Sequence, residues 1–222
     1  MRGTYSRAMP GSPEPVSAAL HHGLIGDGRT FALIASDGEI AWHCWPTSDA
    51  PSVFAAPPCG PPGGRYRIAP CDDATTTALC ALHEPNVLVT TFTAAAATAE
   101  LEHFMPRTGP QRLIRRLTCM RGAMSFRLEC EPRFNSGQDR HSTAISPDGA
   151  TFRSPTLTLT LRTRVPLRSN GHGVTADFAL HAGESVIFEL RDSENSGSRL
   201  TEAGARALLQ AAYTSAISYS RG

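Results

Sequence analysis

Pairs of carboxylates stand at three places in the sequence, and such pairs could perform acid–base chemistry. Hydrolysis of a glycosidic bond needs one carboxyl group as acid and a second as base or nucleophile. Residues two apart in a strand share a face, so a Glu-x-Glu pair also fits the solvated side of a strand, and adjacent aspartates fit a turn. We expect this structural role, because no aromatic platform or pocket can be placed beside any pair. The pairs are Asp72-Asp73, Glu100 with Glu102, and Glu129 with Glu131.

The chain contains only two tryptophans, Trp42 and Trp45, on either side of Cys44. An aromatic ring at the end of a strand can stack on a sugar, but a large ring more often packs in a core or an interface. We therefore expect both rings in the core or at a domain interface, with direct sugar contact as the alternative.

Metal and cofactor chemistry have little support in the sequence. The six cysteines form no C-x-x-C pair and the eight histidines show no ligand spacing, so we expect free thiols and no metal. Two glycine-rich stretches, at 26–31 and 171–176, approach a dinucleotide fingerprint, but each lies in a turn beside strands. The chain has no G-x-S-x-G nucleophile elbow and no lysine. We expect no cofactor.

Composition narrows the class of protein and its partners. A chain of 222 residues with 41% apolar residues, 19 Gly and 17 Pro suits one domain with many turns. The net charge of +1 argues against nucleic acid or an anionic membrane as a partner. The first twenty residues carry Pro and Glu where a signal peptide has an apolar core, and no run of 18 apolar residues follows. We expect a cytoplasmic protein without a membrane span.

The secondary-structure elements that carry the carboxylate pairs and the tryptophans are predicted to be mainly strands. Residues 1–19 read as a flexible leader. Asp37-Gly38 separates two apolar runs, which predicts a hairpin, and the prolines between 46 and 62 predict a long surface connection whose residues 52–56 form one helical turn. Nine further strand-like runs follow, one of which has apolar residues at 126, 128 and 130. In another, leucines at 157, 159 and 161 alternate with Thr156, Thr158, Thr160 and Arg162, which predicts one buried and one solvated face. About eleven strands predict an all-β, antiparallel β-supersandwich.

The period changes after residue 200. Apolar residues recur at three and four positions, which predicts a helix of about five turns. Thr201 is the expected N-cap and Glu202 is favourably placed for the helix dipole. The apolar positions are Ala205, Leu208, Leu209, Ala212, Tyr213, Ala216 and Ile217.

Three stretches near the start, read together, resemble the opening of glycoside hydrolase family 15 proteins, the bacterial glucoamylases and trehalases. They are HGLIGDGRT at 22–30, SDGEIAW at 36–42 and DAPSVFAA at 49–56. Four later stretches are similar to the same domain: NVLVTTFT at 86–93, HFMP at 103–106, the arginines at 115–116 and 121, and PRF at 132–134. The resemblance spans about residues 20 to 220.

This resemblance implies a sandwich domain at 20–197, a C-terminal linker helix at 198–222, and a following (α/α)6 barrel that carries both catalytic glutamates. No stretch here matches that barrel, and ALLQAAYTSAISYS at 207–220 is similar to the start of the linker. The helix would then expose an apolar face that expects a partner, either the barrel or a second copy in a homodimer. Because it lacks the barrel, the chain alone is expected to be inactive.

Candidate contact residues follow from the same resemblance. Family members commonly carry Ile-Asp-Trp and Pro-Arg-Phe-Asp-Ser-Pro where this chain has Ala41 before Trp42 and PTSDAP at 46–51. An acid, an arginine and an aromatic are therefore missing, which weakens any substrate contact. The candidates for substrate or domain-interface contact are Asp27, Arg29, Trp42, Trp45 and Asp49.

Three functions remain open from the sequence. The first is a non-catalytic domain that supports a glycosidase barrel acting on α-glucosides, joined to it in cis or in trans. The second is a free-standing carbohydrate-binding module that uses Trp42 or Trp45 as a platform for an α-glucoside. The third, a self-sufficient glycosidase, lacks any identifiable site.

Overall fold

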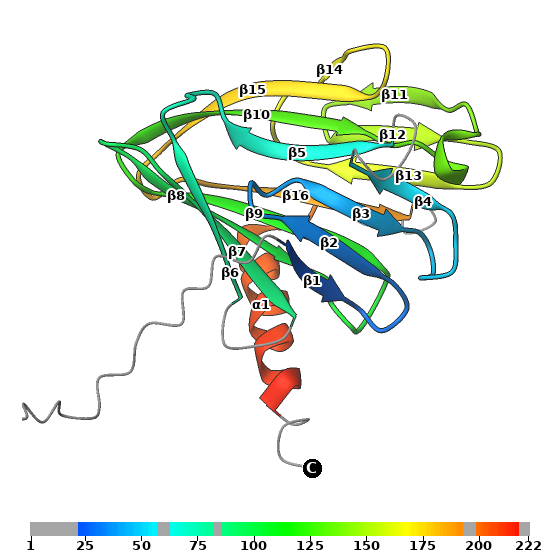
Figure 1. Cartoon of the computed structure of the whole chain (residues 1–222), viewed down its shortest axis with the longest axis horizontal. Coiled ribbons are helices and arrows are strands. Elements are labelled where there is room, and N and C mark those ends of the chain that lie inside the picture. Colours follow the sequence, from blue (N-terminus) through cyan, green and yellow to red (C-terminus); the bar gives the residue numbers. More distant parts are fainter. Residues whose placement is uncertain (1–21, 57–62, 82–85, 193–198, 218–222) are drawn as a thin grey trace, which may run out of the picture.

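The computed structural model describes residues 22–56, 63–81, 86–192 and 199–217, with side chains at 79–81 and 213–217 excepted. Three antiparallel sheets and one helix near the C-terminus make up this part (Figure 1). The expected all-β class with a C-terminal helix is thereby confirmed. The proposed leader, 1–19, lies outside the described residues.

The largest sheet, called here the large sheet, has eight strands in the order β11-β12-β13-β16-β9-β8-β7-β6. All its pairings are antiparallel, and its centre is the long pair of β9 with β16. Its strands are β6 (Thr76–Ala81), β7 (Val87–Thr93), β8 (Thr98–Phe104), β9 (Arg112–Arg121), β11 (Ser142–Ser146), β12 (Gly149–Arg153), β13 (Thr158–Arg162) and β16 (Ser185–Asp192).

Two four-stranded sheets lie against the large sheet. The small sheet has the order β14-β15-β10-β5, and the N-terminal sheet has the order β1-β2-β3-β4. The two meet where β3 and β4 contact β5. The small sheet comprises β5 (Arg65–Pro70), β10 (Ala123–Glu131), β14 (Arg168–Ser169) and β15 (Val174–His181). The N-terminal sheet comprises β1 (His22–Gly26), β2 (Phe31–Ala35), β3 (Ile40–Cys44) and β4 (Ser52–Ala55).

One apolar core joins the three sheets, because side chains alternate along the strands and one face of each sheet points inward. In β10 the alternation holds throughout, with Phe126, Leu128 and Cys130 all fully buried as expected. In β13 the expectation of a solvated outer face is wrong at Thr160, which is 7% exposed. Its hydroxyl lies 3.3 Å from that of Thr151 on β12, so the polar face there is covered.

The hairpin predicted at Asp37-Gly38 joins β2 to β3. Gly38 has φ +82°, which glycine adopts without the steric cost that other residues incur, and its N–H donates to the Ala35 carbonyl. The helical turn expected at 52–56 is wrong. Residues 52–55 form β4, the last strand of its sheet, in which Phe54 pairs with His43 and points into the core. On the side away from β3, the Ala55 N–H donates to the Gly64 carbonyl and the Val53 carbonyl accepts from the Arg133 N–H.

The C-terminal helix α1 (Glu202–Ile217) begins as expected. The hydroxyl of Thr201 accepts a hydrogen bond from the Gly204 N–H at 3.1 Å, which confirms the N-cap. The expectation that its apolar face lacks a partner is wrong for the side chains that the structure describes, because these pack on the outer side of the large sheet (Figure 1). The contact joins Leu209 and Ala212 to Val87, Phe104 and Ile114. A homodimer through this helix stays a prediction.

Candidate functional site

The turn between β1 and β2 holds two of the sequence candidates, Asp27 and Arg29. The Asp27 carboxylate accepts hydrogen bonds from the backbone N–H groups of Arg29 and Thr30 at 2.8 and 2.9 Å. The buried Thr30 hydroxyl donates to the Cys44 carbonyl at 2.7 Å, which fixes the turn against β3. Asp27 therefore shapes the turn, whereas the Arg29 side chain is exposed.

Polar residues of the large sheet hold this end of the N-terminal sheet in place. Buried Asn86 accepts from the Gly26 N–H at 2.8 Å and donates to the Met105 carbonyl at 3.1 Å. Gln111 donates to the Pro46 carbonyl at 2.7 Å, and the Arg29 carbonyl accepts from the backbone N–H of Ser48, which brings the loop after β3 to the same end.

A shallow hollow of about 320 Å³ lies at this end. Arg29, Asn86 and Arg107 line it together with Leu24 and Phe31. With two guanidinium groups beside an apolar rim, the hollow favours contact with an acidic or polar chemical group over a cation. Asn86 and Arg107 were not among the sequence candidates, since neither belongs to a motif that indicates chemistry.

Trp45 lies in the core rather than at a binding surface, with 2% of the residue exposed. Its ring meets His43 edge to face, with centroids 5.4 Å apart. Burial lowers the pKa of His43 to about 4, although the hydrogen bond to the Phe31 carbonyl raises it in part. The expectation of a core position is confirmed for Trp45, and sugar contact by this ring is excluded.

Asp49 is exposed in the loop between β3 and β4. A hydrogen bond from the Thr47 side chain lowers the pKa of Asp49, so this carboxyl group is held in its charged form. A general acid needs the opposite shift. The loop that carries Asp49 is joined to the turn of Arg29 by the hydrogen bond from the Ser48 N–H to the Arg29 carbonyl. The hydrogen bond from Thr47 is typical of an aspartate that stabilises a turn.

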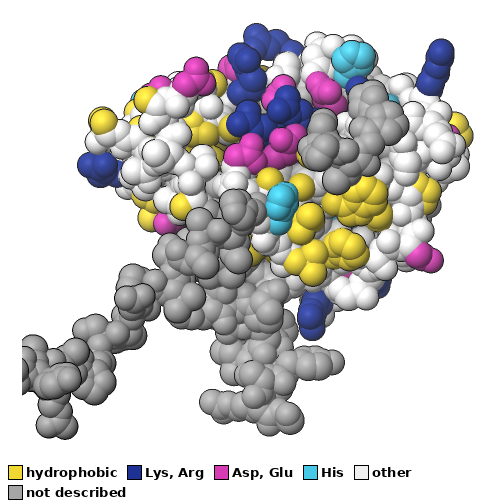
Figure 2. All heavy atoms as spheres, in the orientation of Figure 1, with side chains coloured by type: hydrophobic (Ala, Val, Ile, Leu, Met, Phe, Trp, Pro, Cys, Tyr) yellow, Lys and Arg dark blue, Asp and Glu magenta, His cyan; other side chains and the backbone are white. Residues whose placement is uncertain are grey.

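Trp42 lies on the outer face of the N-terminal sheet, and its neighbours there are apolar. It pairs with Leu33 of β2 and with Ala55 of β4, and Leu33 pairs in turn with Leu24 of β1. Figure 2 shows hydrophobic side chains gathered over β1, β2 and β3. We call this surface the apolar face; its residues are Leu24, Phe31, Leu33, Ala35, Trp42 and Ala55, and the exposed His22, which pairs with Ala35, lies at its edge.

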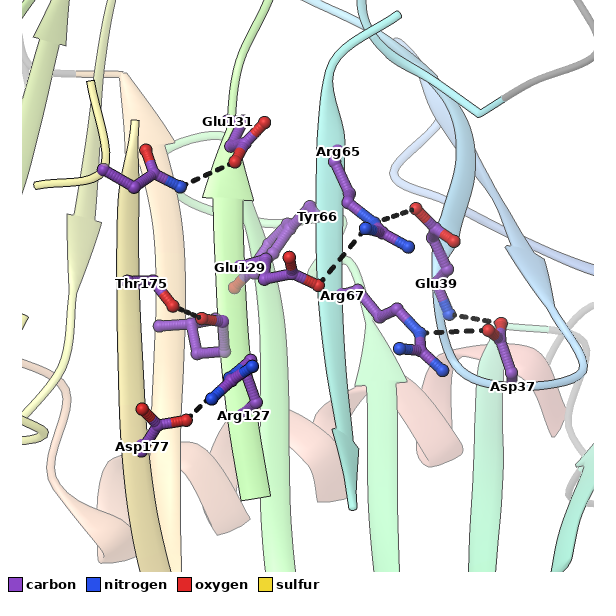
Figure 3. A network of polar contacts seen from close by, with 12 residues as sticks. Asp37, Glu39, Arg65, Tyr66, Arg67, Arg127, Glu129, Glu131, Thr175 and Asp177 are labelled. Carbon is purple, nitrogen blue, oxygen red and sulfur yellow. Dashed lines mark hydrogen bonds and ion pairs between the residues drawn. The ribbon is translucent and has the colours of Figure 1, made fainter. Parts of the chain in front are cut away.

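A strip of paired charges borders the apolar face, on the outer side of the small sheet and the β2–β3 hairpin (Figure 3). Arg65 lies 3.0 Å from Glu39 and 3.4 Å from Glu129. Two further pairs of arginine with aspartate extend the strip, so positive and negative side chains neutralise one another along it. These pairs are Arg67 with Asp37 at 3.1 Å and Arg127 with Asp177 at 2.7 Å.

The carboxylate pairs of the sequence do not form a hydrolytic site. Glu129 belongs to the charged strip, and Glu102 accepts from Arg116 at 2.7 Å. Arg116 also donates to Glu202 at 2.7 Å. Burial alone would raise the pKa of Glu202, but the hydrogen bond and charge of Arg116, with further hydrogen bonds, lower it. Asp72 accepts from the Ala74 N–H at 2.9 Å, as expected for a turn.

A larger cleft of about 810 Å³ lies between β13, β16 and the start of α1. Its lining includes no aromatic side chain on which a sugar ring could stack. Each carboxylate in it is paired: Glu189 with Arg112 at 3.1 Å, Asp148 with Arg199 at 3.3 Å, Glu184 with His181 at 3.3 Å, and Glu202 with Arg116. The cleft is therefore a poor match for glycoside hydrolysis.

Within the described residues, no three His, Cys, Asp or Glu side chains are placed to hold a metal ion. Of the six cysteines, Cys44, Cys71, Cys119 and Cys130 are free thiols, as expected, whereas Cys59 and the side chain of Cys80 lie outside the described part of the chain. None of the helices described has the length and apolar character that crossing a membrane requires.

Comparison with known proteins gives the family. The model of the trehalase-like N-terminal domain matches residues 13–212. A trehalase of Sulfolobus acidocaldarius is 34% identical over 60% of this chain and 23% of its own length, and a trehalase of Thermoplasma volcanium is 28% identical over 68% of this chain and 25% of its own. A trehalase of Mycolicibacterium smegmatis is 24% identical over 85% of this chain and 32% of its own. The chain thus spans a quarter to a third of the length of these relatives. The resemblance read from the sequence is confirmed to that extent, and the chain belongs to the family of trehalase-like N-terminal domains.

Proposed function

We propose that this chain is a non-catalytic domain that supports the catalytic region of a glycoside hydrolase of family 15, of the trehalase or glucoamylase type. The catalytic region would be an (α/α)6 barrel acting on α-glucosides, joined in cis or in trans. In this proposal residues 20–197 form the supporting domain and 198–222 the linker.

The observation that carries the proposal is the pairing of carboxylates with arginines. An acid catalyst must hold its proton near neutral pH, and this requires a raised pKa. The described carboxyl groups whose pKa is shifted all move the other way; they are Asp49, Asp177, Glu184 and Glu202. Arginines hold Asp177 and Glu202 and also Glu102, Glu129 and Glu189. Asp49 instead accepts from Thr47, and Glu184 accepts from His181. These contacts of the described carboxylates support a role for this domain in which the chemistry is performed by another region.

The matched relatives agree with this division of labour. They are named trehalases, and about two thirds to three quarters of each lies outside the segment that this chain matches. That remainder is long enough to hold a catalytic domain of its own. By analogy, the substrate class of the assembled enzyme would be α-glucosides such as trehalose.

Co-expression tests the proposal. The remainder of the Mycolicibacterium smegmatis trehalase, without its matched segment, is produced alone and together with this chain, and soluble yield and glucose release from trehalose and maltose are measured. The expected result is no glucose from this chain alone and a higher yield or activity of the remainder in its presence. Glucose release by the pure chain would overturn the proposal. It would also be overturned if this chain changed neither the yield nor the activity of the remainder of the Mycolicibacterium trehalase or of the Sulfolobus trehalase.

A further inference from the structure

A hollow of about 450 Å³ lies where the chain leaves β10, and it shares no residue with the sites described above. One wall is the segment 133–143, which includes the 3₁₀ turn η1 (Asn135–Gly137), and the other is the turn from β14 to β15. Strands β11 and β14 contact each other, which brings the two walls together (Figure 1). The lining includes Arg133, Asp139, Arg140, His141, Thr143 and His172.

Positive charge in this hollow is poorly compensated. The guanidinium of Arg133 donates to the His172 carbonyl at 2.9 Å, and its distance to the carboxylate of Glu131 is 3.9 Å. Arg140 is exposed and forms no hydrogen bond or ion pair with the residues that the structure describes. Two guanidinium groups therefore line the hollow without a carboxylate in direct contact.

Asp139, the carboxylate of the described lining, does not neutralise these arginines. One of its oxygens accepts from the Asn135 amide at 3.2 Å and the other from the Thr156 hydroxyl at 3.1 Å. These bonds hold a strained turn, because Asn135 and Ser136 have φ values of +51° and +53°. Such strain in residues other than glycine is concentrated at functional sites and ligand clamps. Asp139 thus fixes the shape of the hollow and leaves its positive charge in place.

His141 adds a ring that can donate a hydrogen bond. The ring packs edge to face against Phe134 and Phe152, with centroids 5.3 and 6.1 Å apart. Burial, and then the charge of Arg133, lower the pKa of His141. The imidazole is therefore neutral at pH 7, with one N–H to donate. An anion bound beside it would offset the charge of Arg133 and favour the protonated ring.

We propose that this hollow binds a phosphate group, carried either by inorganic phosphate or by a small phosphate ester such as that of a sugar. Arg133 and Arg140 supply guanidinium donors, which suit phosphate oxygens, and His141 and Thr143 add a ring N–H and a hydroxyl. A phosphate group has several acceptor oxygens and a charge near −2, whereas a carboxylate has two oxygens and a single charge. The volume leaves room for the rest of a small ester. The site is independent of the supporting function proposed above.

Calorimetric titration of the whole chain with inorganic phosphate tests the site, at neutral pH and at an ionic strength held constant with sodium chloride. Three proteins are compared: the unsubstituted chain, Arg140→Gln and Arg121→Gln. Arg121 is also exposed but lies at the other end of β10, roughly 30 Å from Glu131 by the rise of a strand. Because both variants lose one positive charge, they change the general attraction for anions equally.

We expect saturable binding to the unsubstituted chain with a Kd of about 1 mM or lower. Kd should rise about tenfold or more in Arg140→Gln and less than about threefold in Arg121→Gln. The fold should be unaffected in Arg140→Gln, since Arg140 makes no contact that holds the described structure together.

The pKa of His141, followed by NMR, is a second measurement that a purely structural role would not move. Besides Phe134 and Phe152, the groups that face the ring are Arg133, Arg140 and Asp139. A bound phosphate adds negative charge to this set, so the pKa of His141 should rise at saturating phosphate. The rise should be smaller in Arg140→Gln at the same phosphate concentration. His181, exposed at the end of β15, is the internal control and should keep its pKa.

Further titrations identify the ligand. Sulfate should compete with phosphate, and acetate should not. Tighter binding of glucose 6-phosphate than of inorganic phosphate would identify an ester as the ligand, and equal or weaker binding would identify free phosphate. The proposal is overturned if neither phosphate compound binds saturably, if Arg140→Gln and Arg121→Gln have the same Kd, or if acetate binds as tightly as phosphate.

Discussion

The guanidinium of Arg115 lies 4.5 Å from the centre of the Tyr66 ring, at a point where all three sheets meet. Arg115 is on β9 of the large sheet and is fully buried. It donates to the Tyr66 carbonyl of the small sheet at 3.2 Å and to the Gly38 carbonyl of the β2–β3 hairpin. One side chain thus joins the sheets through main-chain acceptors, and burial lowers its pKa.

Replacing Arg115 should destabilise the whole domain. Arg115→Met removes the buried charge but leaves two buried carbonyls without their donor, and each unsatisfied group costs about 1–3 kcal/mol. We expect the free energy of unfolding in urea to fall by about 2–4 kcal/mol. Arg127→Met, which breaks an exposed pair with Asp177, is the control and should leave the transition unchanged. A more stable Arg115→Met variant would mean that desolvation of the charge outweighs its hydrogen bonds.

Stability should decrease as the pH falls below about 6.5, because buried histidines are held neutral. The pKa of His43 is lowered from 6.5 to about 4, and burial lowers that of His103 well below its ordinary value, beside Arg115. Between pH 6.5 and about pH 4, His43 binds a proton in the unfolded chain but not in the folded chain. Each such group lowers stability by about 1.4 kcal/mol per pH unit as the pH falls through this window.

His43→Asn keeps a donor for the Phe31 carbonyl but does not titrate. The slope of unfolding free energy against pH, measured by urea unfolding from pH 6.5 to 4, should become shallower by about one proton. His172→Gln, on an exposed turn, is the control for the loss of an exposed imidazole. An unchanged slope in His43→Asn would show that His43 gains its proton without unfolding.

The cap of α1 makes a separate prediction. Thr201→Ala removes the acceptor for the Gly204 N–H and should lower stability by about 1 kcal/mol, whereas Thr201→Ser should retain most of it. Amide hydrogen exchange at residues 204–205 localises the effect, since these N–H groups bond to Thr201. Equal exchange in all three proteins would mean that packing on the large sheet alone holds the helix.

Tryptophan fluorescence should not respond to sugars. Trp45 is buried, and the two residues that face Trp42, Leu33 on β2 and Ala55 on β4, offer no hydroxyl-binding groups. Titration with trehalose, maltose and longer α-glucans should give no saturable change in emission. A saturable change that Trp42→Phe abolishes would instead identify a carbohydrate-binding module.

Strands with strict alternation or a clear turn signal could be predicted from the sequence, and strands without either signal could not. β10 and the β2–β3 hairpin carry clear periodic or turn signals. β1 contains glycines, β4 lies between prolines, and β11 and β12 are short and rich in small or polar residues. These strands form because neighbours supply a ladder and a core, which local patterns do not encode.

The same limit applies to the site. Trp42 and Trp45 look equivalent in the sequence, but β3 shifts register after His43, and the two rings end up on the surface and in the core. Arg115 donates to the carbonyls of Tyr66 and Gly38, which lie 49 and 77 positions earlier in the sequence. Its role therefore depends on how the sheets pack against one another. Asn86 is likewise 60 positions from the turn it holds.

The strand order sets the sequence in which this domain can fold during synthesis. β1 to β4 pair with their neighbours in the chain, whereas β9 at 112–121 pairs on one side with β16 at 185–192. Closing that longer loop costs roughly 2 kcal/mol more conformational entropy than closing a hairpin turn. As the chain leaves the ribosome, the N-terminal sheet can therefore assemble early, while β9 keeps an open hydrogen-bonding edge until β16 has been made.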